Sequence, residues 1–253
     1  MSTKKNLYSY SYCGRCRIQF NLENGCTMSK PAALDTKLST VSLSGDIPGV
    51  FTATQKRSVR IRDSFINVGV EALNDTRLRD LTVAQLCQRS GNSVGAFYTR
   101  FKDKDAYFRA LRGYAIDSHN LEARAKFNIE SLARCDTTQT LERLVDVMVD
   151  IFTGRFRGVL RESLLLILEP DDPWAPMRDA AQKVVATLQA SLVDAFPDKT
   201  PAETNVQCRF CFQIIVGTLQ NDLINDYHVF TTKDDSLRNG LKKAVCAYMG
   251  LAK

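Results

Sequence analysis

The chain has 253 residues, of which 44% are hydrophobic and 25% charged, and its formal net charge is +6. This composition is that of an ordinary globular protein with a sizeable core, and it excludes a chain that is disordered throughout. No apolar run approaches the length that spans a bilayer, because the densest, LLLIL at 164–168, is only a fragment of a helix. The N-terminus carries two lysines without an apolar stretch behind them, so we expect a cytoplasmic protein rather than a secreted one.

The positive charge is concentrated in the front half. Residues 1–113 carry 18 Lys and Arg against 9 Asp and Glu, whereas residues 114–253 carry 16 against 19. This asymmetry indicates that one end of the molecule meets a polyanion, although an unevenly charged solvated surface would give the same counts.

Residues 1–50 are predicted to be a disordered N-terminal extension, since they are rich in Ser, Thr, Asn and Gly and end in the breaker-rich GDIPG. They contain a C-x-x-C motif at Cys13 and Cys16, with Cys26 nearby. A structural zinc site needs four ligands, so incidental reduced thiols are the favoured interpretation and no metal or cofactor is expected. A cysteine-based metal or redox sensor is the alternative. Cys208 and Cys211 are interpreted as small core residues, with a redox pair as the lesser possibility.

Residues 51–113 are predicted to form three helices and the start of a fourth. Residues 55–74 carry an apolar stripe at helical spacing behind a basic first turn with Lys56 and Arg57. Thr82 and Gln85 form a capping box for a short second helix, which Gly91 ends in the left-handed conformation.

Ser93 can cap a third helix, VGAFYTRF, with Phe97 and Phe101 on its inner face, and Asp103 can cap a fourth that begins KDAYF. Short helices joined by a tight turn and followed by a longer helix are typical of a helix-turn-helix unit with its connecting helix.

The helical period continues through residues 114–253, so the fold is predicted to be all-α. Leu141, Leu144, Val145, Met148 and Phe152 mark one helix. Asp172-Pro173 is predicted to begin another, whose buried face carries Met177, Ala181, Val184, Leu188 and Leu192. Thr200 and Glu203 form a capping box for a helix that is apolar around most of its circumference at 205–224. The last helix, from Asp235, is expected to point Leu237, Leu241, Ala244, Val245 and Tyr248 inward.

A helix-turn-helix binds DNA by placing its second helix in the major groove. Small residues at Gly95 and Ala96 would let that helix approach base edges, and Val94 could meet a thymine methyl group. Packing is an equally good reason for Ala96. Ser93, Thr99 and Arg100 offer polar contacts to bases or phosphates. Tyr98, Lys104, Lys56 and Arg57 are candidate phosphate contacts, with a solvated basic face as the alternative for the last two.

The stretch LTVAQLCQRSGNSVGAFYTRFKDKDAYFRAL, within 56–115, resembles the DNA-binding domain of the TetR (tetracycline-repressor-like) family of bacterial transcription regulators. The resemblance implies an all-helical homodimer that binds a near-palindromic operator, with a C-terminal half that dimerises and often holds a small-molecule inducer. It also implies DNA contacts at Thr82, Ser93, Val94, Gly95, Tyr98, Thr99, Arg100 and Lys104.

The predicted function is therefore a dimeric DNA-binding transcription regulator, a repressor released by a ligand. Residues 114–253 would dimerise through the last two helices and bind the ligand, for which the candidate residues are Met148, Phe152, Phe156, Trp174, Met177 and Phe212. Ordinary core packing is the alternative for most of these six. A second hypothesis is a regulator-shaped protein that organises DNA or binds a partner without an inducer. No catalytic motif is present, so an enzyme is not expected.

Overall fold

The computed structural model describes residues 11–13, 16–18, 47–166, 175–225 and 229–251. Its contacts divide the chain into two units, residues 1–40 and 41–253. In the first unit the described residues form a small antiparallel hairpin of β1, Ser11–Cys13, and β2, Cys16–Ile18. In the register of its main chains Cys13 stands opposite Cys16. The rest of the predicted extension up to residue 46 lies outside the described residues.

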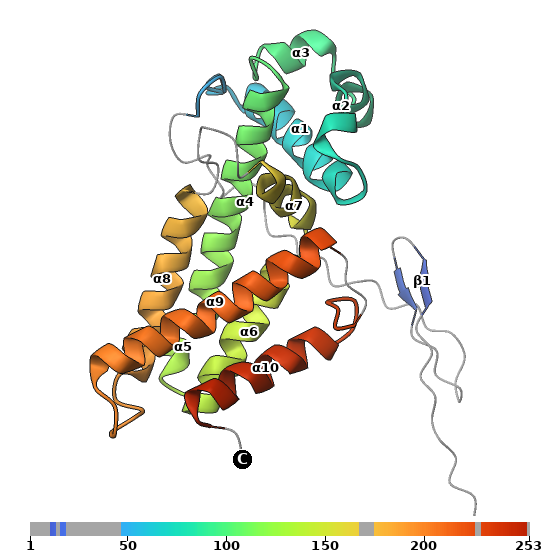
Figure 1. Ribbon diagram of the computed structural model, residues 1–253. Helices are drawn as coiled ribbons and strands as arrows, with labels where there is room; N and C mark the ends of the chain where they lie inside the picture. Colours follow the sequence, from blue (N-terminus) through green and yellow to red (C-terminus); the bar gives the residue numbers. More distant parts are fainter. Residues whose placement is uncertain (1–10, 14–15, 19–46, 167–174, 226–228, 252–253) are drawn as a thin grey trace, which may run out of the picture. The chain divides into compact units, whose positions relative to one another are not determined.

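The second unit is helical, which confirms the predicted fold class. Its N-terminal part consists of α1 (Lys56–Asp75), the 3₁₀ turn η2 (Leu78–Asp80), α2 (Val83–Ser90) and α3 (Val94–Tyr98). The long helix α4 (Lys104–Lys126) begins beside α3 and runs on into the C-terminal helices (Figure 1). It crosses the domain boundary that the sequence places at 113/114.

An aromatic cluster fills the interior of this N-terminal part. The rings of Phe65, Phe97, Phe101 and Tyr107 pack with centroids between 5.0 and 6.3 Å apart, mostly edge to face. The Tyr107 hydroxyl donates a hydrogen bond of 2.7 Å to the Phe65 carbonyl, and burial raises the pKa of this tyrosine. A Cβ atom on Gly69 would lie 1.9 Å from that hydroxyl oxygen, so α1 needs a glycine where α4 crosses it.

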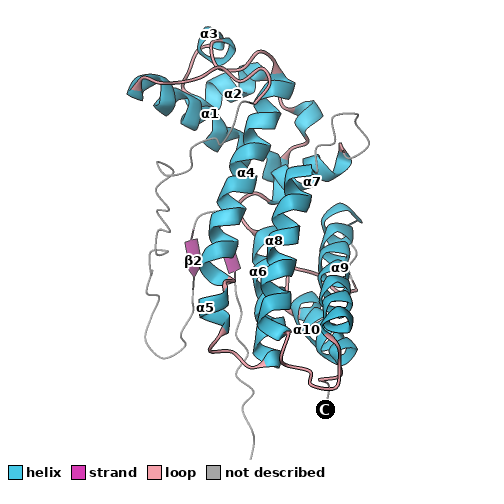
Figure 2. Ribbon diagram, turned by 90° about the vertical axis from the view of Figure 1, so that its left-hand side faces the viewer, coloured by secondary structure: helices cyan, strands magenta, loops and turns pink. Residues whose placement is uncertain are grey.

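The C-terminal part is a bundle of α5 (Ile129–Leu132), α6 (Thr137–Thr153), α7 (Arg157–Leu165), α8 (Ala175–Leu192), α9 (Pro201–Asn225) and α10 (Ser236–Met249), packed with the second half of α4 (Figure 2). The predicted capping box at Thr200 and Glu203 is present. Leu141, Leu144 and Val145 are fully buried, as predicted. The predicted helix start at Asp172-Pro173 lies outside the described residues.

The two parts of this unit are joined where α7 lies on the end of α1. Glu162 is buried in α7 and accepts hydrogen bonds from the Arg77 side chain at 2.7 Å and from the Leu78 main-chain N–H at 3.0 Å. Arg161 donates to the carbonyls of Leu73 and Thr76, which the end of α1 leaves without helical partners. This junction therefore satisfies polar groups that a helix terminus would otherwise leave unpaired.

The contact between these helices is close enough to require a glycine. A Cβ on Gly158 would lie 2.1 Å from the Leu73 carbonyl oxygen, so no other residue fits without moving α7 away from α1. The Gly158 N–H donates to the Asn74 side chain at 2.9 Å. The position of α1, and with it the helix-turn-helix, is thus fixed directly by α7.

Candidate DNA-binding surface and ligand cavity

The turn of the predicted helix-turn-helix forms as expected. Thr82 and Gln85 make a reciprocal capping box at the start of α2, and Gly91 ends α2 with a φ of 67°. The Ser93 hydroxyl then accepts a hydrogen bond from the Ala96 N–H at 3.1 Å and begins α3. These local bonds set the direction in which α3 leaves the turn.

The exposed face of α3 carries most of the predicted contact residues. Phe97 is fully buried, whereas Val94 and Tyr98 are 49% and 50% exposed. Ser93, Gly95 and Thr99 are also exposed, and Ala96 is half-buried. Thr82, Lys56 and Arg57 are exposed as well, although the Thr82 hydroxyl is used in the capping box. The structure therefore presents a small, weakly polar surface with one large aromatic side chain.

Arg100 does not belong to this surface. It is 8% exposed, and its guanidinium donates to the Ala96 carbonyl at 2.8 Å and to the carbonyl and hydroxyl oxygens of Ser58 in α1. A cation held by several hydrogen bonds inside the protein is not available to a base edge or a phosphate. The predicted DNA contact at Arg100 is thus contradicted by this geometry, and its role here is to fasten the end of α3 to α1.

Lys104 also has an internal role that the sequence did not reveal. Its half-buried ammonium donates to the main-chain carbonyls of Leu78, Arg79 and Leu81, at 3.1, 3.4 and 3.4 Å. These carbonyls belong to the turn directly before Thr82 and have few other partners. Lys104 therefore fixes the approach to α2, and a phosphate contact at this residue stays a prediction.

The segment before α1 is joined to the end of α3, which sequence reasoning missed. The Phe51 N–H donates to the Arg100 carbonyl at 2.8 Å, and the Lys102 N–H donates to the Gly49 carbonyl at 2.8 Å. Gly49 has a φ of 78°, and a Cβ there would lie 2.9 Å from the Ala106 side chain. The only signal of this contact in the sequence was Gly49, the second glycine of GDIPG, and it looked like an ordinary helix breaker.

A cavity of about 300 Å³ lies among α4, α6, α8 and α9. Four of the six predicted ligand residues, Met148, Phe152, Met177 and Phe212, line it. Phe156 does not line it but packs behind the wall, with its ring 5.2 Å from that of His119. Trp174 lies outside the described residues. Met177, Ala181 and Val184 were expected to be buried, but they are only half-buried because they border this cavity.

His119 and several amides are lining residues that the sequence did not suggest. His119 is 7% exposed, and its Nδ1 atom has no hydrogen-bond partner among the described residues. Burial lowers the pKa of this imidazole to about 4, against a smaller opposite effect of Glu122. Asn120, Gln213, Gln220 and the charged Arg178 also contribute polar groups to the lining. A lone histidine in a helix gives no signal in sequence that it borders a cavity.

Comparisons with known proteins agree with this architecture. No family model matches the chain. The HTH-type transcriptional regulator BetI of Serratia proteamaculans is 32% identical over 84 residues, which are 33% of this chain and 41% of that relative. A putative TetR-family transcriptional regulator from Mesorhizobium loti has a TM-score of 0.59 at 12% identity, covering 78% of this chain and 98% of that one. A second from Rhodococcus sp. has a TM-score of 0.54 at 16% identity, covering 75% and 98%.

The chain has the TetR-family fold. The resemblance predicted from the helix-turn-helix stretch is thereby confirmed at the level of the fold. The chain spans about two fifths of the length of the BetI relative, so the similarity in sequence concerns a part of each protein.

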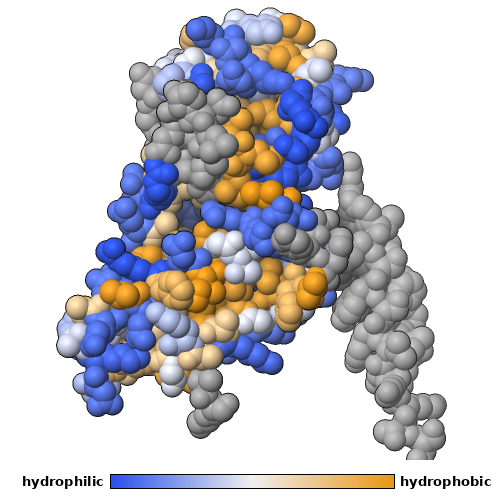
Figure 3. All heavy atoms as spheres, viewed as in Figure 1, coloured by the Kyte–Doolittle hydropathy of each residue, from blue (hydrophilic) through white to orange (hydrophobic). Residues whose placement is uncertain are grey.

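On this TetR fold, α9 and α10 share an exposed apolar face. Val206 and Phe210 in α9 are 64% and 48% exposed, and the Phe210 ring packs 5.0 Å from that of Tyr248 in α10. Hydrophobic side chains gather along α9 in the space-filling view (Figure 3). Ala244 and Tyr248 were expected to point inward, but both are exposed on α10. The helical period placed them near the buried stripe, and they lie at its outer edge.

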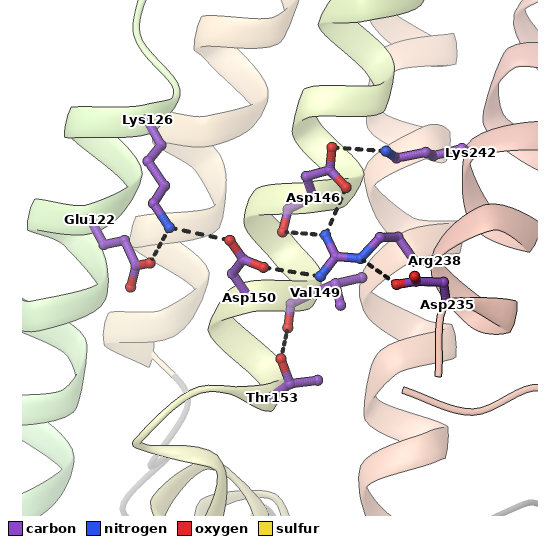
Figure 4. A network of polar contacts seen from close by, with 9 residues as sticks. All are labelled: Glu122, Lys126, Asp146, Val149, Asp150, Thr153, Asp235, Arg238 and Lys242. Carbon is purple, nitrogen blue, oxygen red and sulfur yellow. Dashed lines mark hydrogen bonds and ion pairs between the residues drawn. The ribbon is translucent and has the colours of Figure 1, made fainter. Parts of the chain in front are cut away.

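A chain of ion pairs connects α4 to α10 through α6 (Figure 4). Lys126 in α4 binds Asp150 in α6, which also binds Arg238 in α10 at 3.0 Å. Arg238 and Lys242 both reach Asp146, at 2.7 and 2.8 Å. Burial alone would raise the pKa of Asp146, but the hydrogen bonds from Lys242 and Arg238 lower it. These pairs hold α10, and thus its exposed face, against the helices that border the cavity.

Four cysteines of the helical part, Cys87, Cys208, Cys211 and Cys246, are buried, whereas Cys135 is half-buried. Burial raises the pKa of Cys208 to about 11 and that of Cys211 to about 12, so both are thiols at neutral pH. Among the residues that the structure describes, no three His, Cys, Asp or Glu side chains are grouped to hold a metal ion. Within the same ranges no helix is long and apolar enough to cross a membrane.

Proposed function

We propose that this protein is a homodimeric, cytoplasmic DNA-binding transcription regulator of the TetR type. It is a repressor that a small molecule releases from a near-palindromic operator. The observation that carries the DNA-binding proposal is Gly95, in the middle of the exposed face of α3.

Nothing inside the protein requires a glycine at position 95. A Cβ at this position would find its nearest neighbour, the Ser93 hydroxyl, 3.9 Å away, and its φ is not in the left-handed region. A glycine inside a helix costs about 0.5–1 kcal/mol relative to alanine. Such a residue on an exposed face is explained by a partner whose surface comes close to the helix backbone. The edge of the bases in a major groove is such a surface.

The residues around Gly95 fit direct contact with DNA. Val94 can meet a thymine methyl group, Ser93 and Thr99 can donate to bases or phosphates, and the exposed hydroxyl of Tyr98 can reach a phosphate. Lys56 and Arg57 add positive charge at the start of α1. Because Arg100 is buried, no long polar side chain of α3 reads the bases, so much of the specificity comes from DNA shape.

The exposed apolar face of α9 and α10 supports the proposed dimer. A helix pair that exposes Val206, Phe210 and Tyr248 is covered when a second copy packs against it. In such a dimer the two α3 helices must lie about 34–36 Å apart to reach successive major grooves. A second copy of this chain is therefore part of the DNA-binding unit.

The cavity is connected to the helix-turn-helix by two helices. α4 contributes wall residues and begins next to α3, and α6 contributes Ile151 and Phe152 immediately before the turn into α7. α7 in turn is fixed to α1 by Gly158 and Glu162. A ligand that binds better to a conformer with a different α3 spacing shifts the population away from DNA.

The proposal is tested by selecting bound sequences from random DNA and footprinting the complex. We expect two protected half-sites about one helical turn apart. Gly95→Ala should leave the fold intact or slightly more stable, because the new methyl group has open space, yet weaken operator binding about tenfold or more as the methyl group meets the groove. Lys56→Ala, which should lower the dependence of binding on salt by about one charge, serves as a comparison.

Two results would count against the proposal. Unchanged operator affinity of Gly95→Ala would remove the argument for close approach of DNA to α3. A single protected site without symmetry would contradict the dimeric mode of binding. If no small molecule released the protein from DNA, the result would instead favour a protein that organises DNA without an inducer.

A further inference from the structure

The described lining of the cavity carries no negative charge. Its wall is formed mainly by aliphatic, thioether and aromatic side chains, including Met148, Phe152 and Phe212. Arg178 is the one charged residue among the described lining residues, and it is exposed and already has an interaction partner. A cation bound here would lose its hydration without gaining a counter-charge. An anion would have to compete for Arg178 with the partner that this residue already has, so both signs of charge are unfavourable.

His119 provides an uncharged polar group in this apolar surrounding. Its pKa is lowered by burial to about 4, so the imidazole is neutral at pH 7. Its Nδ1 atom is buried without a partner among the described residues, an arrangement that proteins rarely leave in place without a function. A neutral imidazole has one donor and one acceptor nitrogen, which matches a hydroxyl or carbonyl group of a ligand.

The size of the cavity limits the ligand further. About 300 Å³ lies at the lower end of the range of about 300–1,000 Å³ that is usual for small-molecule sites. The aromatic rings of Phe152 and Phe212 and the flexible thioethers of Met148 and Met177 in the lining suit a flat, polarisable body. A molecule of one or two rings fits these limits better than a large drug.

We propose that the cavity binds an uncharged, flat and largely apolar molecule whose hydroxyl or carbonyl group is hydrogen-bonded to His119. This assignment rests on the proposed function, since it names the chemical class of the ligand that releases the regulator. It makes His119 the residue that selects a polar group within an otherwise apolar site.

The test uses four probes of one shape: 2-naphthol, naphthalene, 2-naphthoate and 2-naphthylmethylammonium. Their dissociation constants are measured by equilibrium dialysis at pH 7 for the full chain and for three variants. We expect 2-naphthol to bind the unmodified protein most tightly, about fivefold or more tighter than naphthalene, which corresponds to one net hydrogen bond. The two charged probes should bind more weakly than naphthalene.

The variants locate the effect. His119→Phe should keep naphthalene binding and abolish the preference for 2-naphthol, while His119→Gln, which retains a hydrogen-bonding group, should keep part of it. Ala181→Trp should fill the cavity and weaken all four probes. Circular dichroism spectra identify any variant that fails to fold. If a variant does fail, the order in which the unmodified protein binds the four probes still tests the inference.

Three results would overturn the inference: tightest binding of a charged probe, an undiminished preference for 2-naphthol in folded His119→Phe, or equal binding by unmodified protein and Ala181→Trp. Operator binding is measured in parallel. If the protein binds its operator but prefers a charged probe, only this inference is refuted. If the protein binds 2-naphthol through His119 but binds no DNA, only the proposed regulatory function is refuted.

Discussion

Replacing His119 by Phe or Gln is expected to make the stability of the protein less sensitive to acid. The pKa of His119 is about 4 in the folded protein, whereas an unfolded histidine titrates near 6.5. Between these two values the unfolded chain binds more protons than the folded one. The free energy of unfolding therefore decreases as the pH falls from about 6.5 towards 4, and this part of the decrease is absent when residue 119 cannot be protonated.

The magnitude follows from the two pKa values. A separation of about 2.5 pH units is worth about 3 kcal/mol in total, at about 1.4 kcal/mol for each unit. Between pH 7 and pH 5, where the folded protein stays largely unprotonated at this site, the share of His119 is about 2 kcal/mol. That is a large fraction of the stability of a typical domain, so the effect is readily measured.

Urea denaturation at pH 7, 6 and 5, at one protein concentration, measures the effect. His119→Phe and His119→Gln differ in packing and will differ in stability at pH 7, but both lack the titrating imidazole. Their unfolding free energies should therefore fall less between pH 7 and pH 5 than that of the unmodified protein, by the same amount of about 2 kcal/mol. Parallel pH profiles for all three proteins would refute the reasoning, because His119 would then not be buried and neutral.

Three further predictions concern the helix-turn-helix and its attachment. Glu162→Ala should lower the free energy of unfolding by about 3 kcal/mol, since it leaves the Leu78 N–H and the Arg77 side chain without an acceptor. Glu162→Gln should cost clearly less, and equal losses in urea denaturation would contradict the ion-pair argument. Gly158→Ala should cost about 2 kcal/mol or more, because the new methyl group meets the Leu73 carbonyl, and a neutral effect on the melting temperature would argue against the close contact. Deletion of residues 1–40 should leave operator affinity unchanged, whereas deletion of residues 1–51 should reduce it several-fold by removing two main-chain hydrogen bonds to the end of α3; identical affinities of the two deletions in a mobility-shift assay would exclude that role.

Much of the fold could be predicted because its signals are local. A capping box depends on two residues three apart, so Thr82 with Gln85 and Thr200 with Glu203 could be identified from the sequence alone. The left-handed Gly91 and the buried pair Phe97 and Phe101 are likewise set by neighbours in the chain. The helical period then gave the inner face of α6.

The site was less predictable because its decisive contacts are distant in sequence. Arg100 looked like a DNA contact, and only the position of Ser58, 42 residues earlier, shows that its guanidinium is used inside the protein. The helical repeat of apolar residues also shows that one face of a helix is apolar. It does not show whether other side chains fill the space next to that face. For this reason Ala181 and Val184 were assigned to a core, although they border the cavity.

The burial of Arg100 also bears on the thermodynamics of the DNA binding that we propose. α3 is a helix of five residues, far shorter than one that would be stable in isolation. The Ser93 cap holds its beginning, and the hydrogen bonds of Arg100 to Ala96 and Ser58 hold its end. The helix is thus ordered before it meets an operator, so complex formation loses little backbone entropy at the reading surface. A recognition element kept rigid in this way discriminates between sequences by the deformation it demands of the DNA rather than by adapting to each one.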